Sequence, residues 1–173
     1  MKRILAIVGD SGSGKTSLGL YLGKLGYRWI VSYTTRPMRE GETDGVQHMF
    51  VSDGDYPGDD AIMAYADFGG YRYWTTFHQF EDGMNVYVID EDALVEMEDK
   101  IKGMNDFSVI KIYIKRNGID VGSERMERDR NRTRLPVSYY DLVIENDTDE
   151  DTFLRKSADA IGNIIKQKYG SYR

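Results

Sequence analysis

Apolar and polar positions alternate along the chain in blocks that predict an α/β fold. Short apolar runs, rich in Ile, Val and Tyr, predict five strands at 3–8, 27–33, 86–89, 109–114 and 142–144. Helical spacing of apolar residues begins near Lys15, begins again after Asp90, and extends over 151–168. Strands that alternate with helices form a parallel sheet, because each crossover returns the chain to the same edge. The pattern therefore predicts a three-layer α/β/α domain with a central parallel sheet.

Residues 34–83 depart from this alternation, because turn residues and short β-rich runs replace the helical spacing. Strands are predicted over 46–51, 61–68 and 71–75, and Gly69-Gly70 is a hairpin signal between the last two. One or two helical turns are predicted over 77–82. We therefore expect a small β-rich subdomain inserted into the α/β frame.

The predicted organisation is a single domain with three parts. Its core comprises 1–33, 84–114 and 136–173, the inserted subdomain covers about 34–83, and a short helical lid covers about 115–135. The lid helix is predicted to begin near Ser123, after two glycines, and to end at Pro136.

A glycine-rich segment lies between the first predicted strand and the first predicted helix: Gly9-Asp10-Ser11-Gly12-Ser13-Gly14-Lys15-Thr16. It matches the phosphate-binding pattern Gly-x-x-x-x-Gly-Lys-Ser/Thr in the strand–loop–helix setting that the pattern requires. Glycines let backbone N–H groups converge on one anion, and the helix dipole adds positive potential. A plain glycine-rich turn requires neither Lys15 nor Thr16, so phosphate is the expected ligand.

Lys15 is the catalytic cation in this interpretation, because it can reach the β- and γ-phosphates of a nucleoside triphosphate. The hydroxyl of Thr16 is a candidate ligand of Mg²⁺. The residues expected to hold the donor nucleotide are Gly9, Ser11, Gly12, Ser13, Gly14, Lys15, Thr16 and Ser17.

Two further groups are candidates for phosphate or metal chemistry. Arg36 and Arg39 lie in a polar loop, where they could clamp a second phosphate, or could be surface arginines paired with Glu40 and Glu42. Asp90 follows a buried strand, where ligands bind in open α/β sheets, so it is a candidate for Mg²⁺ or for the acceptor. Its alternative role is the N-cap of the next helix, and both roles are compatible.

The predicted lid helix carries arginines on one face: Arg125, Arg128 and Arg132. As lid residues they would close over the transferring phosphates and stabilise the developing charge, with Arg125 and Arg128 as catalytic candidates. The alternative is a solvated helix with i,i+3 and i,i+4 ion pairs to interleaved carboxylates.

The composition of the chain limits the kinds of partner that it is expected to bind. A net charge of −6 gives no global electrostatic case for binding nucleic acid or an anionic membrane. The chain has no cysteine, which excludes disulfides and thiolate-bound metals, and no apolar run approaches the ~20 residues of a membrane helix. We predict a cytoplasmic monomer or homodimer whose partners are small-molecule nucleotides.

These motifs, in this order, resemble the guanylate kinases, P-loop enzymes that phosphorylate GMP with ATP. The stretch 32–50 is similar to the family pattern Ser-x-Ser/Thr-Thr-Arg-x-Pro-Arg-x-Gly-Glu-x-x-Gly-x-x-Tyr-x-Phe. Residues 66–73 resemble the second acceptor-site segment, and 140–146 resemble the family's Tyr-Asp-x-Val-Ile-x-Asn. The resemblance spans almost the whole chain, and implies ATP as donor, Mg²⁺ as cofactor, and an NMP-binding role for the inserted subdomain.

The resemblance also implies roles for individual residues. Arg36, Arg39 and Tyr73 would hold the acceptor phosphate, and Ser32 and Thr75 would contact its base. Glu42 matches the family's loop glutamate, and His48 replaces a tyrosine that contacts the acceptor phosphate. The remaining implied positions are Asp90 at the end of the central strand, Arg116 and Arg125 as lid arginines, and Asn146 near the adenine of ATP.

The acceptor-base site departs from the family pattern. The guanine-contacting glutamate, nine residues before Tyr73, is Ala64 here, and the glycine after that tyrosine is Trp74. Three functions follow: a guanylate kinase-like enzyme, a kinase of another nucleotide or phosphorylated metabolite, or a kinase-shaped binding module without catalysis. The phosphate-binding residues count against the third, and the first is the function that we predict.

Overall fold

A computed structural model describes residues 1–117 and 133–170. Its larger sheet contains β1 (Lys2–Gly9), β2 (Arg28–Ile30), β7 (Gly83–Val88), β8 (Phe107–Lys115) and β9 (Leu142–Glu145). The strands are parallel and follow the order β2-β7-β1-β8-β9, so β1 lies at the centre. The predicted parallel sheet is confirmed, with β1 bringing the glycine-rich segment to the middle of its carboxyl edge.

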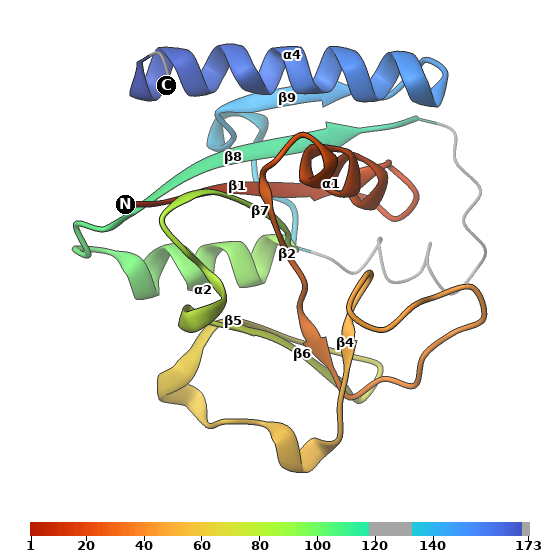
Figure 1. Ribbon diagram of the computed structural model, residues 1–173, viewed down its shortest axis with the longest axis vertical. Helices are drawn as coiled ribbons and strands as arrows, with labels where there is room; N and C mark the ends of the chain where they lie inside the picture. Colours follow the sequence, from red (N-terminus) through yellow and green to blue (C-terminus); the bar gives the residue numbers. More distant parts are fainter. Residues whose placement is uncertain (118–132, 171–173) are drawn as a thin grey trace.

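Three helices complete the layers: α1 (Lys15–Lys24), α2 (Glu91–Ile101) and α4 (Glu150–Tyr169). Leu5 and Ile7 of β1 pack in a buried cluster with residues of α1 and α4, whereas Ile4 and Ala6 pack in a second cluster with α2. Successive residues of a strand point to opposite faces, so one central strand serves both clusters. Figure 1 shows α4 and α2 on opposite sides of the sheet. The three-layer α/β/α prediction is confirmed.

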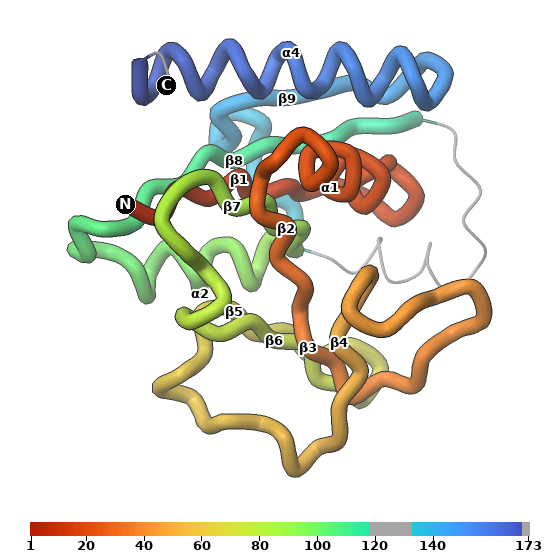
Figure 2. The backbone as a smooth tube through the Cα atoms, viewed as in Figure 1, coloured from red at the N-terminus to blue at the C-terminus, as the bar shows by residue number. Residues whose placement is uncertain are grey.

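A second, mixed sheet contains β3 (Tyr33–Thr34), β4 (Met49–Phe50), β5 (Ile62–Phe68) and β6 (Tyr71–Thr76), in the order β4-β3-β6-β5. The predicted hairpin is confirmed, since β5 and β6 are antiparallel and Gly69 and Gly70 both have positive φ. Met63 and Ala64 of β5 join the buried cluster on the α2 side of the core. Figure 2 shows this sheet beyond α2, away from α4.

Short 3-10 turns connect the strands: Asp53–Asp55, Asp59–Ala61, Phe77–Gln79 and Val137–Tyr139. One or two helical turns were possible over 77–82, and the structure has one, at Phe77–Gln79.

The prediction of one strand over 27–33 is wrong. The structure has two strands there, and they belong to different sheets: Ile30 of β2 pairs with Tyr87 of β7, and Tyr33 of β3 pairs with Trp74 of β6. The apolar pattern continues through Val31 because both sheets need buried residues at this point. The chain therefore passes from the core sheet to the smaller sheet within one apolar run.

The prediction of a strand over 46–51 is also wrong, since only Met49–Phe50 is a strand. The residues before it form tight turns: Gly45 N–H donates to the carbonyl of His48, and Val46 N–H donates to that of Thr43. Most of the predicted lid helix lies outside the described residues, together with Arg125, Arg128 and Arg132, and its last predicted residues, 133–135, are not helical. Within the described ranges, no helix is both long enough and apolar enough to span a membrane.

Gly19 of α1 marks a close approach between the first helix and β2. A Cβ atom added at Gly19 would lie 2.0 Å from Trp29 Cζ3, whereas one added at Gly23 would lie 3.5 Å from Trp29 Cβ. The indole cannot retreat freely, because its Nε1 donates to the carbonyl of Val46 at 3.0 Å. Glycine at position 19 is therefore required by packing.

We expect Gly19→Ala to destabilise the protein by about 1–3 kcal/mol, the usual cost of overpacking a core. Gly23→Ala is the matched control, since it adds the same methyl group at an ordinary contact distance and gains up to about 1 kcal/mol of helix propensity. Urea denaturation of the two variants measures the difference. Equal midpoints would contradict the packing role of Gly19.

Candidate functional site

The glycine-rich loop between β1 and α1 is held from behind by β9 and α4. Gly14 is the N-cap of α1 in the left-handed conformation, with φ of +101°. A Cβ atom there would lie 2.8 Å from Asn146 Nδ2 and 2.9 Å from Phe153 Cε1. Asn146 is buried and its Nδ2 donates to the carbonyl of Ser13 at 2.9 Å. The loop is therefore fixed in shape by its neighbours, as an anion site of backbone N–H groups requires.

Three cationic side chains contact this loop. Lys15 Nζ donates to the carbonyl oxygens of Gly9 at 2.7 Å and Asp10 at 2.6 Å. Arg116 Nη1 donates to the carbonyl of Gly12 at 3.3 Å, so an arginine expected near the lid reaches the loop. Arg134, which sequence analysis did not single out, forms an ion pair with the carboxylate of Asp10. The positive charge near the loop would therefore attract a polyphosphate.

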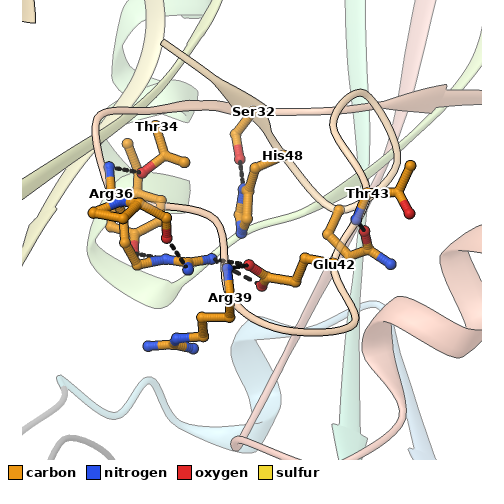
Figure 3. A network of polar contacts seen from close by, with 10 residues as sticks. Ser32, Thr34, Arg36, Arg39, Glu42, Thr43 and His48 are labelled. Carbon is orange, nitrogen blue, oxygen red and sulfur yellow. Dashed lines mark hydrogen bonds and ion pairs between the residues drawn. The ribbon is translucent and has the colours of Figure 1, made fainter. Parts of the chain in front are cut away.

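A buried ion pair orders the polar loop that follows β3. Arg36 is only 7% exposed, and its Nη2 lies 2.9 Å from Glu42 Oε1 and 3.0 Å from Oε2 (Figure 3). Its Nε donates to the hydroxyl of Tyr73 at 3.1 Å, which ties the loop to β6. The pairing of Arg36 with Glu42 agrees with the interpretation of Arg36 as a surface arginine paired with a neighbouring carboxylate. Arg36 is buried, however, so it is not a solvated surface side chain.

Glu42 fixes the second arginine as well, through the backbone. Glu42 Oε2 accepts from the N–H of Arg39 at 2.8 Å. Although burial opposes it, the hydrogen bond from Arg36 holds the pKa of Glu42 below its usual value. Figure 3 shows the Arg39 side chain extending away from Glu42, and no group in 1–117 or 133–170 pairs with its guanidinium. Arg39 therefore offers a cation to a bound anion.

His48 lies beside this cluster. Its Nδ1 is hydrogen-bonded to Ser32 Oγ at 2.9 Å, and its ring meets the Tyr73 ring edge-on at a centroid distance of 5.4 Å. Burial lowers the pKa of His48, and the charge of Arg36 lowers it further. The imidazole is therefore neutral near pH 7, and its protonation is coupled to the charges around it.

One pocket of about 320 Å³ joins the loop to the arginine cluster. The predicted site residues that line it are Ser11, Gly12, Lys15, Thr16, Ser32, Arg36, Arg39, Glu42, His48, Tyr73 and Asp90. The predicted residues that do not line it are Gly9, Ser13, Gly14, Ser17, Thr75, Arg116 and Asn146. Arg125 and Arg128 lie outside the described residues. The structure thus brings both groups of phosphate-binding candidates to one cavity.

Asp90 has the capping role that was one of its two predicted roles. Its Oδ1 accepts from the N–H of Ala93 at 2.9 Å, which caps α2. Asp90 also lines the pocket that Thr16 lines, so the two candidate oxygen ligands face one cavity.

Sequence analysis missed several residues of the pocket wall: Trp29, Gln47, Tyr65, Phe68, Tyr87 and Val88. The most informative is Tyr87, whose hydroxyl accepts a hydrogen bond from Thr75 Oγ1 at 3.3 Å. One signal was available, because Tyr87 interrupts an aliphatic strand just before the carboxyl edge where ligands bind. No periodicity shows which partner such a side chain meets.

Comparison with known proteins agrees with this geometry. A family model described as guanylate kinase matches residues 1–162, nearly the whole chain. The chain belongs to the guanylate kinase family. It is similar to a guanylate kinase of Chlorobium luteolum, at 28% identity over 96% of this chain and 94% of that protein. A guanylate kinase of Neisseria gonorrhoeae is 30% identical over 83% of this chain and 80% of that protein.

Solved structures support the fold of this guanylate kinase family member. The crystal structure of guanylate kinase from Anaplasma phagocytophilum has a TM-score of 0.63 to this chain, at 22% identity, covering 98% of this chain and 88% of that one. The expected family and its P-loop α/β fold are therefore confirmed, and the family is one of phosphotransferases.

The lowered pKa of His48 predicts a pH dependence of stability. A histidine whose pKa is lower in the folded than in the unfolded state stabilises the fold fully above the unfolded value, about 6.5. That stability is lost as the pH falls through the lower folded value. We therefore expect the free energy of unfolding to decrease from pH 7.5 to pH 5.5, and expect His48→Gln to flatten this decrease.

His78 provides the control, since it is exposed in the turn Phe77–Gln79 and is the only other histidine of the chain. Urea denaturation at both pH values should show the wild-type slope in His78→Gln. If His48→Gln showed the same decrease in the free energy of unfolding as the wild-type protein, the pH dependence could not be assigned to His48.

Proposed function

We propose that the protein transfers the γ-phosphoryl group of ATP, with Mg²⁺, to a nucleoside monophosphate of the GMP type. One observation carries the proposal: a single cavity connects the glycine-rich loop with the arginine cluster of the inserted subdomain. Transfer between two phosphates requires both to be held in one space from which water can be excluded.

The donor side rests on the loop and its cations. Backbone N–H groups at the start of α1 would bind the β-phosphate, and Lys15 would turn from the carbonyls of Gly9 and Asp10 to the phosphate oxygens. Arg116, already in contact with Gly12, would add positive charge to the same phosphates. The proposed roles of these side chains are therefore electrostatic.

Thr16 and Asp90 are the proposed protein ligands of Mg²⁺. Both are oxygen donors on the pocket wall, which suits Mg²⁺. The described residues contain no group of three or more His, Asp or Glu that could hold a metal alone, and Mg²⁺ characteristically keeps waters and phosphate oxygens in its shell. When bound, Mg²⁺ supplies Lewis-acid charge to the transferring phosphate.

The acceptor side rests on the Arg36–Glu42 pair. Glu42 orients the guanidinium of Arg36 and holds the backbone of Arg39, so one guanidinium and the base of the second side chain are positioned before any ligand binds. Tyr73 lies within hydrogen-bond distance of Arg36 and is proposed to contact the same acceptor phosphate. Such a site positions and neutralises the acceptor, and the chemistry needs no general base.

We expect Lys15→Ala to lower turnover by about 100-fold or more, the usual cost of removing a charge-stabilising donor from a transition state. Production of ADP from ATP, Mg²⁺ and GMP measures this. Lys24→Ala is the matched control, because Lys24 is exposed at the far end of α1. An unchanged rate in a folded Lys15→Ala protein would contradict the proposal.

We expect Arg39→Ala to raise the KM for the monophosphate by about 10- to 100-fold, the equivalent of one charge-assisted hydrogen bond. The KM for ATP should not change, because Arg39 belongs to the acceptor side. Arg155→Ala, at an exposed position of α4, should leave both constants at the wild-type values. A parallel rise in both KM values would instead place Arg39 on the donor side.

A further inference from the structure

Tyr87 is a rigid phenol in the wall of the pocket. It belongs to β7, where it pairs with Ala6 on one side and Ile30 on the other. Its ring packs edge-on against Phe80 at a centroid distance of 5.8 Å, and only 5% of the residue is exposed. A side chain held in this way presents its hydroxyl group in one direction.

The hydroxyl of Tyr87 is set up as a donor. It accepts the hydrogen bond of Thr75 Oγ1, which is itself fully buried. Because that bond uses the phenol oxygen, the O–H proton must find an acceptor elsewhere, and no group in the described parts of the chain provides one. Burial raises the pKa of Tyr87, so the proton stays in place near neutral pH. The pocket therefore presents a buried donor to its ligand.

The carboxylates that line the pocket already have partners. Among the described residues they are Glu42 and Asp90. Both oxygens of Glu42 are bonded to Arg36, and Oε2 also accepts from the Arg39 N–H, while Oδ1 of Asp90 caps α2. Beside Thr75, across the ladder of β5 and β6, lies Ala64, which cannot accept a hydrogen bond through its side chain.

Gln47 adds a second donor to the same cavity. Its Oε1 accepts from the N–H of Thr43 at 2.8 Å, which leaves the amide N–H₂ for a ligand. The uncommitted side-chain groups of Tyr87 and Gln47 are thus both donors. A base that offers acceptor atoms fits this wall, whereas an exocyclic amine meets no anionic side chain dedicated to it.

We propose that Tyr87 determines base specificity by donating to the 6-oxo group of the acceptor purine, and that the 2-amino group is not recognised. This inference rests on the proposed function, because it concerns the acceptor of the same reaction. It assigns the substrate class as 6-oxopurine nucleoside monophosphates, with GMP and IMP as near-equivalent acceptors.

The size of the expected effect follows from the chemistry. A site that hydrogen-bonds a substrate amine rejects the analogue without it by several orders of magnitude, because its own buried groups are left unpaired. A site with no partner for the amine has no such penalty. We expect kcat/KM for GMP and IMP, measured by ADP production with ATP and Mg²⁺, to agree within about fivefold.

Comparison of GMP with IMP in the wild-type protein distinguishes failure of the specificity inference from failure of the proposed kinase function. A preference of tenfold or more for GMP over IMP would overturn the inference and leave the kinase function intact. Turnover of neither nucleotide, by a folded protein, would overturn the proposed function and the inference with it. A ratio below tenfold, with clear turnover of both, supports the inference.

Tyr87→Phe tests the contact itself. We expect it to lower kcat/KM for GMP and IMP by a similar factor of about tenfold, mainly through KM, and to leave the KM for ATP unchanged. Purine riboside 5′-monophosphate, which has no oxygen at C6, should lose nothing further in the variant. Tyr71→Phe is the matched control, because Tyr71 is 39% exposed and does not line the pocket.

An equal loss with all three monophosphates would show that Tyr87 only supports the wall, and would overturn its assigned contact. If thermal denaturation shows that Tyr87→Phe is not folded, the ratio of GMP to IMP in the wild-type protein decides the amine half of the inference. The relative rate of wild-type protein with purine riboside monophosphate and with IMP then decides the 6-oxo half, since loss of the Tyr87 partner should cost about tenfold.

Discussion

The close approach of β9 and α4 to the glycine-rich loop is the constraint on which the site depends. Gly14 has no room for a Cβ atom, because Asn146 and Phe153 lie against it, and Asn146 also holds the Ser13 carbonyl. These contacts join residues that are more than 100 positions apart in the sequence, so the shape of the loop depends on long-range packing. An anion site of this kind depends on tertiary packing as well as on its own glycines.

The polar loop that carries Arg36, Arg39 and Glu42 is ordered by charge instead. Regular structure is sparse between β3 and β5, where β4 has only two residues. A single carboxylate, Glu42, holds the Arg36 side chain and the Arg39 backbone, and Arg36 in turn reaches Tyr73 on β6. Removing one partner from such a buried pair leaves the other charge uncompensated. The two halves of the pocket therefore have different physical origins.

Much of this arrangement could be predicted from sequence, because the signals are local. The central strands follow from apolar runs, and the phosphate loop follows from glycines, Lys15 and Thr16 at fixed spacing. The division of 27–33 between two sheets could not be predicted, since both sheets require apolar residues there. The Thr75–Tyr87 contact was equally inaccessible, because it joins two strands from different sheets and leaves no mark on the periodicity of either.

Lys15 has a thermodynamic consequence for the ligands that the loop selects. Its ammonium group is already satisfied by two carbonyl oxygens, so a ligand gains only the difference between its own contacts and those it displaces. A lone phosphate would accept hydrogen bonds from the N–H groups of the loop, with or without displacement of Lys15. A triphosphate would supply oxygens for the N–H groups of the loop and for the hydroxyl of Thr16 at the same time. Release of Lys15 from its two carbonyl contacts would therefore be offset best by a ligand that forms several contacts at once.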